Sequence, residues 1–513
     1  MKLQLKSIFS GIYILKNAIC RMLSQGKKIA IWLCNRIILI FQWRYKLYEI
    51  INRYIIKWDN LTAFTKNLYV GIIISIVLFN IHDLQLIRLK EDAGMDWMMK
   101  IFRGQIPFKK DMPNFVFIDI DDDTYLSWGE PFFTPRDKLL KIIKFAVNGK
   151  ARVVMIDIDL SHESYNEVNR RSNMLHQHDK KLYDYLYNYS VACKSKTDGK
   201  ARCPQIILSK SLRIKQGKKK NQTFLEIRPS FLDKPVENSN DVHWAMTLFN
   251  IDKDKTIRRW RLWDKVYTEN GQIEYIPAMH LLAALFVKQS QKSRMTILKE
   301  LNMYLKNTDN DNQLFFKDST GGIRKMGNKL YLGKNTETIT ISKKPSHTSL
   351  RIMYKMPWKL PKGEERPNIL QILPAKYCTN KDYIPDADLY DKVVIIGGSY
   401  TESRDIYTTP LGDSPGALIV LDATHSLLRY GELRPIAIPK KLIIEIILIV
   451  FMSYVFSRFE GFWSMFFAGF FIYACLLPLS FIFFKSGVWL DFTIPLIGIQ
   501  FRQTSAGFNR PKP

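Results

Sequence analysis

The chain has 513 residues, of which 47% are hydrophobic and 13% aromatic, and it carries a net charge of +28. Most apolar residues gather near the two ends, which favours a membrane protein over a string of soluble domains. The basic clusters outside the N-terminal region lack interleaved aromatic residues and helical periodicity, so we assign them to solvated loops and expect no nucleic-acid binding.

The N-terminal region, residues 1–67, holds twelve Lys or Arg residues against two acids. A first apolar segment follows at 68–87; its fully apolar part is short for a bilayer. The basic flank fits the positive-inside pattern, which places residues 1–67 in the cytoplasm. Because the apolar run begins far from Met1 and no small-residue cleavage site follows it, we interpret the segment as a retained membrane span rather than a cleaved signal peptide.

The following region, residues 88–440, predicts an α/β domain. Continuous apolar runs beginning at Phe115, Val153 and Val393 predict buried parallel strands. Between the first two runs, residues 136–148 place their apolar positions on one helical face, so strand, helix and strand form a βαβ unit. The fold class is therefore α/β with a mostly parallel sheet. Further along we expect a strand hairpin over 244–263, a helix over 276–288, a long polar insertion over 291–345 and a helix over 415–429.

Two cysteines of this domain, Cys193 and Cys203, bracket a lysine-rich loop. A zinc site would need two further ligands, and no CxxC or HxxxH spacing supplies them. If the domain lies in an oxidising compartment, we favour a disulfide between these cysteines over free thiols.

Acidic residues gather after the first two predicted strands, with Asp119 and Asp121 after the first and Asp157 after the second. The carboxyl ends of parallel strands line the usual ligand crevice, so these acids are expected close together. Such a cluster suits Mg²⁺ or Ca²⁺, as in a metal-dependent hydrolase. The alternative is that the acids cap loops and pair with Arg136 or Arg404. Since no nucleophile stands at a spacing that completes a reaction, we assign no catalytic residue, metal or cofactor.

A Gly-Gly-Ser-Tyr sequence at 397–400 follows the third predicted strand. Glycine permits a tight turn there, and its backbone N–H groups could receive an anion. It matches neither a nucleophile elbow nor a Walker loop. We favour a structural turn, with a small-anion site as the second interpretation.

Three further apolar segments, 442–456, 462–484 and 488–501, predict transmembrane helices. Three returning spans place the basic tail, 502–513, in the cytoplasm; if the third segment is only a packed hairpin, the tail lies outside. Glu445 is the one acid inside a predicted span; partners on other helices, which a proton or ion pathway would need, are not evident, so we expect an interface-level structural role.

Several segments, in their order along the chain, resemble the type 2 CHASE domain, an extracellular sensing domain of bacterial receptors. The resemblance covers most of the chain from residue 96 to the final spans, and the ordered set is far more specific than any one motif. Two departures are an Asp-Lys-Thr-Ile-Arg-Arg sequence at 254–259, where the family often has an Asp-Gly turn before an arginine, and the insertion at 291–345. The matching motifs are 96–104, 116–123, Gly129 with Pro135 and Arg136, 153–159, 391–399, 404–411 and 415–424.

The resemblance implies a noncatalytic sensor or accessory signalling subunit in the bacterial inner membrane, with its main domain in the periplasm. Receptors of this family continue into a cytoplasmic output domain, whereas about a dozen residues follow the last predicted span here, so we expect a separate effector protein. The expected partners are an unidentified small ligand or envelope component, the lipid bilayer and that effector, and homo-oligomerisation stays open. The predicted ligand-binding residues, taken from strand ends and family motifs, are Asp119, Asp121, Arg136, Asp157, Arg404, Asp405 and Thr409.

Two other functions stay open. One is a structural or assembly component of a cell-envelope complex that uses the domain as a protein-binding platform. The other is an extracytoplasmic metal-dependent hydrolase, which would depend on Asp119 and Asp157.

Overall fold

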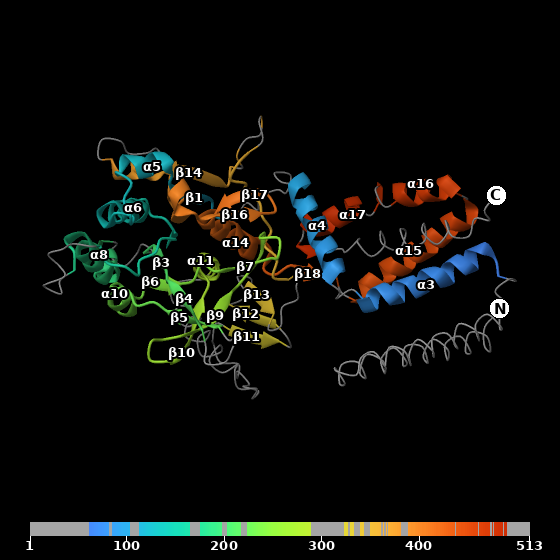
Figure 1. Cartoon of the computed structure of the whole chain (residues 1–513), viewed down its shortest axis with the longest axis horizontal. Coiled ribbons are helices and arrows are strands. Elements are labelled where there is room, and N and C mark those ends of the chain that lie inside the picture. Colours follow the sequence, from blue (N-terminus) through green and yellow to red (C-terminus); the bar gives the residue numbers. More distant parts are fainter. Residues whose placement is uncertain are drawn as a thin grey trace, which may run out of the picture. The chain divides into compact units, whose positions relative to one another are not determined.

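The computed structural model describes residues 61–489, apart from 82–84, 103–111, 165–174, 197–202, 217–222, 289–322, 327–328, 333–338, 343–348, 361–362, 364–365, 367, 381–387, 437, 460, 472–473, 476 and 486. The chain divides into two compact units, one made of residues 1–80, 442–472 and 498–513 and the other of 81–441 and 473–497 (Figure 1). The second unit contains the predicted α/β domain.

A six-stranded sheet forms the centre of the second unit, in the order β14-β1-β15-β2-β3-β6, and every neighbouring pair is parallel. This confirms the predicted α/β class with a mostly parallel sheet. The strands are β1 (Phe115–Ile120), β2 (Val153–Ile156), β3 (Gln205–Ser209), β6 (Val242–Ala245), β14 (Leu370–Pro374) and β15 (Val393–Gly398).

Helices cover both faces of this sheet, which explains why its strands are continuous apolar runs. Alternate side chains of β1 enter different cores: Val116 and Ile118 pack in one, Phe115 and Phe117 in the other. The first core is closed by α6 (Arg136–Asn148), α8 (Gln177–Tyr187), α10 (Asp233–Glu237) and α13 (Ala375–Thr379). The second is closed by α4 (Gln85–Phe102), α11 (Met279–Lys288) and α14 (Gly416–Tyr430), so the unit has three layers (Figure 1).

The predicted βαβ unit is present as β1, α6 and β2, and α6 has the predicted bounds. However, β1 and β2 are not neighbours, because β15 lies between them. Register pairs Asp119 of β1 with Gly397 of β15, and Ile396 with Ile156 of β2. The acids at the ends of β1 and β2 are therefore separated by a strand that ends in two glycines.

Other predicted elements are present with shifted bounds. The helix expected over 276–288 begins at Met279, because Ile276 belongs to β10 (Ile273–Pro277). The helix expected over 415–429 is α14, and Pro415 ends β17 (Gly412–Pro415). The hairpin expected over 244–263 is shorter, formed by the antiparallel strands β7 (Phe249–Ile251) and β8 (Ile257–Trp260).

Smaller sheets surround the central one. One has the order β10-β9-β5-β4, and β16 pairs with β17 as a hairpin. Within the predicted polar insertion, β11 (Ile323–Met326), β12 (Lys329–Leu332) and β13 (Ile339–Ser342) form an antiparallel sheet; the rest of the insertion lies mostly outside the described residues. The remaining elements of this unit are α5 (Asp122–Ser127), α9 (Tyr189–Lys196), α17 (Leu477–Lys485), β4 (Leu212–Gln216), β5 (Thr223–Ile227), β9 (Trp263–Tyr267), β16 (Ile406–Thr409), β18 (Arg434–Pro435) and β19 (Val488–Trp489).

A disulfide joins Cys193 of α9 to Cys203, just before β3. The two Cα atoms are 6.0 Å apart, and Cys203 is buried in the sheet's first core. The cross-link therefore ties α9 to the start of a central strand.

The apolar segments form helices in both units. In the first unit, α3 (Ala63–Ile81) overlaps the first predicted span, α15 (Ile438–Arg458) contains the second, and α16 (Gly461–Phe471) begins one residue before the third. Of the fourth predicted span, only its start in β19 lies within the described residues. Among the helices of the described residues, none has both the length and the apolar content of a membrane span.

Within the first unit, α3 and α15 contact each other. A Cβ atom on Gly71 would lie 2.8 Å from Cγ2 of Ile449, so the glycine permits a close approach. The Ser75 hydroxyl donates a hydrogen bond to Oε2 of Glu445 at 3.2 Å. Glu445 thus has a polar contact with a residue of another helix, a partner that was not evident from the sequence.

Candidate functional site

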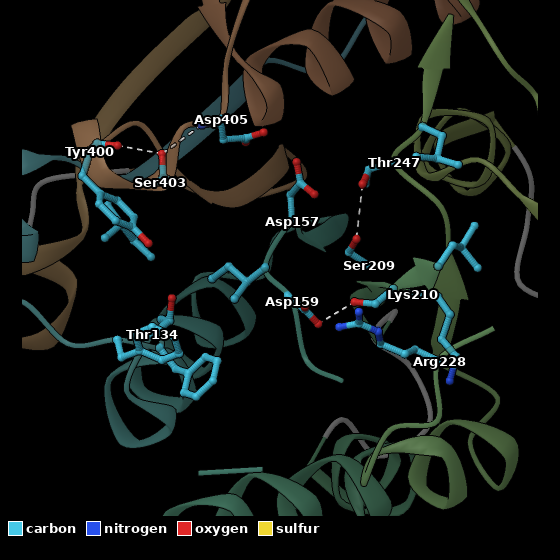
Figure 2. A pocket seen from close by; sticks show the side chains of 18 residues that line it. Thr134, Asp157, Asp159, Ser209, Lys210, Arg228, Thr247, Tyr400, Ser403 and Asp405 are labelled. Atoms are coloured by element: carbon cyan, nitrogen blue, oxygen red, sulfur yellow. Dashed lines mark hydrogen bonds between the residues drawn. The ribbon is translucent and has the colours of Figure 1, made fainter. Parts of the chain in front are cut away.

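A cavity of about 570 Å³ opens at the carboxyl edge of the central sheet (Figure 2). Its walls come from residues that follow β2, β3, β6 and β15 and from the segment before α6. This edge is the usual position of ligand sites in parallel α/β sheets, and the volume lies in the range of small-molecule sites. Its charged and aromatic lining residues are Phe132, Phe133, Asp157, Asp159, Lys210, Arg228, Tyr400 and Asp405.

The second of the two glycines at the end of β15, Gly398, lines this cavity, and the first lies against α14. A Cβ atom on Gly397 would lie 2.5 Å from Cβ of Ala417, so only glycine lets α14 approach the strand this closely. The next two residues then turn the chain, because the N–H groups of Ser399 and Tyr400 both donate to the Ile120 carbonyl, at 3.1 and 3.2 Å. This geometry supports the structural-turn interpretation, since those two donors are already used.

Two carboxyl groups, those of Asp157 and Asp405, lie next to one another at one side of the cavity (Figure 2). Burial raises the pKa of Asp157 to about 7; repulsion by Asp405 adds to the shift, and a hydrogen bond from Thr247 opposes it. Burial likewise raises the pKa of Asp405 to about 6, against hydrogen bonds from Tyr407 and the Gly416 N–H. Both carboxyl groups therefore keep a proton to a higher pH than an ordinary aspartate does.

The guanidinium of Arg228 enters the cavity from another side (Figure 2). Its Nη1 atom is 3.0 Å from Nε2 of His162, and within the described part of the chain it forms no salt bridge. Asp159 also lines the cavity, but its Oδ1 accepts hydrogen bonds from the Ser161 N–H at 2.8 Å, the Ser161 hydroxyl at 2.6 Å and the Ser211 hydroxyl. Burial alone would raise the pKa of Asp159, but these hydrogen bonds outweigh it and hold the pKa below its usual value.

Lys210 contributes less charge to this cavity than its position suggests. Its Nζ pairs with Asp233 and lies 4.5 Å from the centre of the Trp244 ring. These groups line a second cavity of about 550 Å³ beside α10 and β10. The ammonium is therefore engaged away from the acid pair.

Aromatic side chains form the rim. Phe132 is 91% exposed, and its ring contacts that of Phe133 edge to face, with centroids 4.7 Å apart. On the other side, Tyr400 stacks on Tyr125 at 4.4 Å. An exposed phenylalanine at the mouth of a polar cavity offers apolar surface to a bound molecule.

Comparison with protein families matches the CHASE2 domain over residues 70–456. The chain belongs to the CHASE2 family. CHASE2 is a family of sensory rather than catalytic domains. No curated protein and no solved structure matches the chain.

Of the seven predicted ligand-binding residues, the CHASE2 fold places two in the cavity wall, Asp157 and Asp405. Asp119 is buried outside the wall, with its Oδ2 accepting a hydrogen bond from the Ser399 hydroxyl at 2.8 Å, and burial raises its pKa to about 7. Asp121 caps α5, accepting from the Thr124 N–H at 2.8 Å. These two acids shape the loops after β1 and β15.

The other three predicted residues have different roles. The buried guanidinium of Arg136 donates to the carbonyls of Thr134, Asp159 and His162 and so fixes two loops that border the cavity. Arg404 is exposed in the left-handed region, with φ of 52°. The Thr409 hydroxyl donates to the Gly412 carbonyl inside the β16–β17 hairpin.

Sequence reasoning missed Arg228 and the phenylalanine rim. Arg228 follows β5, a strand of a different sheet, so no local signal connects it with the carboxyl edge. Phe132 and Phe133 stand between two recognised motif positions, Gly129 and Pro135, where two exposed aromatic residues in succession were a usable signal. Among the described residues, no three His, Cys, Asp or Glu side chains gather in a group that could hold a metal ion.

Proposed function

We propose that this CHASE2 domain is an extracytoplasmic sensor that binds a small polar ligand in the cavity at the carboxyl edge of its sheet. The observation that carries the proposal is the Asp157–Asp405 pair facing a cavity that Arg228 also enters. Charged groups that face a cavity lose part of their hydration, which costs free energy. A ligand of complementary charge offsets that cost when it binds.

A sensor also needs an element whose position depends on the ligand. Asp405 directly precedes β16, and Thr408 of that strand forms a parallel bridge with Thr256. Two residues later, Arg258 forms a salt bridge with Asp96 of α4, at 2.8 Å. We infer that ligand contact at Asp405 shifts β16 and, through the Thr408–Thr256 bridge, alters the salt bridge between Arg258 and α4. The resulting change in α4 is then transmitted to a separate effector.

Membrane attachment is part of the proposal. In the first unit, α15 and α16 expose large apolar side chains, among them Ile443, Ile446 and Phe462, which are 59%, 59% and 71% exposed. Lipid is the partner that suits such a surface. The Cys193–Cys203 disulfide supports placing the second unit in an oxidising compartment.

A thermal-shift comparison tests ligand binding. Ser209 lines the cavity at the end of β3, so Ser209→Phe fills part of it, whereas Ser195→Phe places the same side chain on the exposed surface of α9. The full-length chain in lipid nanodiscs would be mixed with fractions of a periplasmic small-molecule extract. We expect one fraction to raise the melting temperature of the wild type and the Ser195→Phe control by several degrees and leave Ser209→Phe unchanged.

The same experiment contradicts the proposal if the stabilisation in Ser209→Phe equals that in the wild type. A complete series of fractions with no stabilising member would count against it as well, because a ligand at one hundred times its Kd should contribute about 2.7 kcal/mol.

A further inference from the structure

We propose that the cavity is built for a small zwitterion, with an ammonium group at the Asp157–Asp405 pair and a carboxylate at Arg228. This inference rests on the proposed function and adds the chemical class of the ligand. It follows from the placement of opposite charges in the wall of one cavity.

The ligand's ammonium group would lie beside two carboxyl groups that have no cationic side chain paired with them among the described residues. Within the described part of the chain, neither Asp157 nor Asp405 forms a salt bridge; their hydrogen bonds come from Thr247, Tyr407 and the Gly416 N–H. Two adjacent carboxylates repel each other, so in the empty cavity they retain a proton that relieves the repulsion. An ammonium can replace that proton and donate a hydrogen bond to each carboxylate.

The anionic end is defined by Arg228. Its one hydrogen-bond partner among the described residues is the His162 ring, which accepts from Nη1 when its Nε2 is unprotonated and then carries no charge to pair with the guanidinium. Asp159 is an anion in the same wall, but its Oδ1 already accepts hydrogen bonds from Ser161 and Ser211, and among the described residues it forms no salt bridge with Arg228. A planar guanidinium with unused N–H groups matches the two oxygens of a carboxylate.

Ligands with one charge fit this wall less well. An anion would approach Arg228 but meet the repulsion of Asp157 and Asp405, and a simple amine would leave Arg228 without a salt-bridge partner among the described residues. Lys210 does not change this balance, because its ammonium is paired with Asp233. A short chain of methylene groups between the two charges would face the apolar rim formed by Phe132 and Phe133.

Isothermal titration of the full-length chain in detergent tests the class with matched probes. The zwitterions are β-alanine, γ-aminobutyrate, δ-aminovalerate and ε-aminocaproate, which differ only in the spacing of their charges; butylamine and butyrate carry one charge each. We expect at least one zwitterion to bind and both single-charge probes to bind about tenfold more weakly or not at all. A zwitterion series without binding, or butyrate or butylamine equal to the best zwitterion, would overturn the inference.

Substitutions then test which residues bind the ammonium end and the carboxylate end of the zwitterion. We expect Asp157→Asn and Asp405→Asn to weaken the best zwitterion about tenfold or more, and Asp388→Asn, an exposed aspartate outside the cavity, to leave its affinity unchanged. Arg228→Gln should weaken it to a similar extent, and Arg228→Lys should recover part of the loss. Unchanged affinity in Asp157→Asn, Asp405→Asn and Arg228→Gln would contradict the assigned orientation and with it the inference.

The two levels of the proposal fail in different ways. If a single-charge probe binds the wild type but not Ser209→Phe, the cavity is a ligand site and only the zwitterion class is wrong. If the best zwitterion binds Ser209→Phe as tightly as the wild type, its site lies outside the cavity, which contradicts this inference; the extract experiment decides the proposed function separately.

Discussion

At the scale of single residues, the acid pair links the site to the stability of the fold. The raised pKa of Asp157, about 7, means that the folded state binds a proton more tightly than the unfolded chain, in which an aspartate has a pKa of about 4. This contribution to the free energy of unfolding is fully present below about pH 4 and is lost as the pH rises through about 7. The empty site should therefore make the domain less stable on the alkaline side.

Asp157→Asn should remove that part of the pH dependence. An asparagine keeps the shape of the side chain and has no charge to bury beside Asp405, so the variant should exceed the wild type by about 1–2 kcal/mol at about pH 8 and differ little at about pH 4. Chemical unfolding at several pH values, monitored on the full-length chain, measures this difference. Equal pH profiles for the variant and the wild type would show that burial beside Asp405 does not raise the pKa of Asp157.

Lys255 lies in one of the two departures of this sequence from the family pattern. The residue stands between Asp254 and Thr256, where the resembling sequences often have glycine, and it adopts φ of 63° in the turn between β7 and β8. That region favours glycine, so a lysine there costs about 1 kcal/mol. The turn matters because it positions Arg258, whose guanidinium contacts both Asp254 and Asp96.

At the scale of elements, α4 is held by a buried ionic network. Arg351 is fully buried, and its Nη1 lies 2.5 Å from Oδ1 of Asp92; Arg258 contacts Asp96 at 2.8 Å, and Arg259 contacts Asp252 at 2.7 Å. Arg351, Arg258 and Arg259 each pair with an acid of α4. The network therefore fixes α4 against the β7–β8 hairpin and the segment that contains Arg351.

Removing one member of this network should cost far more than removing a surface pair. We expect Arg351→Met to lower the free energy of unfolding by about 3 kcal/mol, because Asp92 and Asp96 lose a buried counter-charge. Lys376→Met is the matched control: its ammonium pairs with the exposed Asp123 at 3.0 Å, and its loss should cost less than about 1 kcal/mol. Similar losses in the two variants, measured by chemical unfolding, would show that the network does not hold α4.

The sequence predicts some elements of this fold closely and others not at all. The strands β1, β2 and β15 begin at the predicted residues, Phe115, Val153 and Val393. The prediction succeeds because strands buried on both faces are continuously apolar. The position of β15 between β1 and β2 depends on contacts between residues more than two hundred positions apart, which no local pattern encodes. The start of α11 was misplaced because an apolar residue such as Ile276 fits a strand as well as a helix.

The site was predicted in part for the same reason. Asp157 and Asp405 follow from the rule that ligands bind at the carboxyl ends of parallel strands and from the family motifs. Asp121 and Thr409 satisfy the same rules but hold a helix end and a hairpin. Arg228 reaches the cavity from another sheet, and only the three-dimensional arrangement shows it.

At the scale of the whole molecule, membrane attachment remains a prediction with a direct check. After expression in a bacterium, we expect the full-length chain to stay with the membrane fraction through an alkaline carbonate wash, because apolar surface of α15 and α16 would be exposed to water on release. Protease added outside spheroplasts should cleave within residues 88–440. Release by carbonate, or protection of that region from the protease, would contradict the extracytoplasmic anchored arrangement.

The central claim is that a ligand in the cavity alters the contacts between α4 and the β7–β8 hairpin. Hydrogen–deuterium exchange of the full-length chain in nanodiscs, with and without the stabilising periplasmic fraction, measures both ends of this connection. The account predicts slower exchange at 205–211, 244–248 and 398–409 and altered exchange in α4, with both effects absent in Ser209→Phe and retained in Ser195→Phe. Protection of the cavity segments without any change in α4, or the same changes in Ser209→Phe, would contradict it.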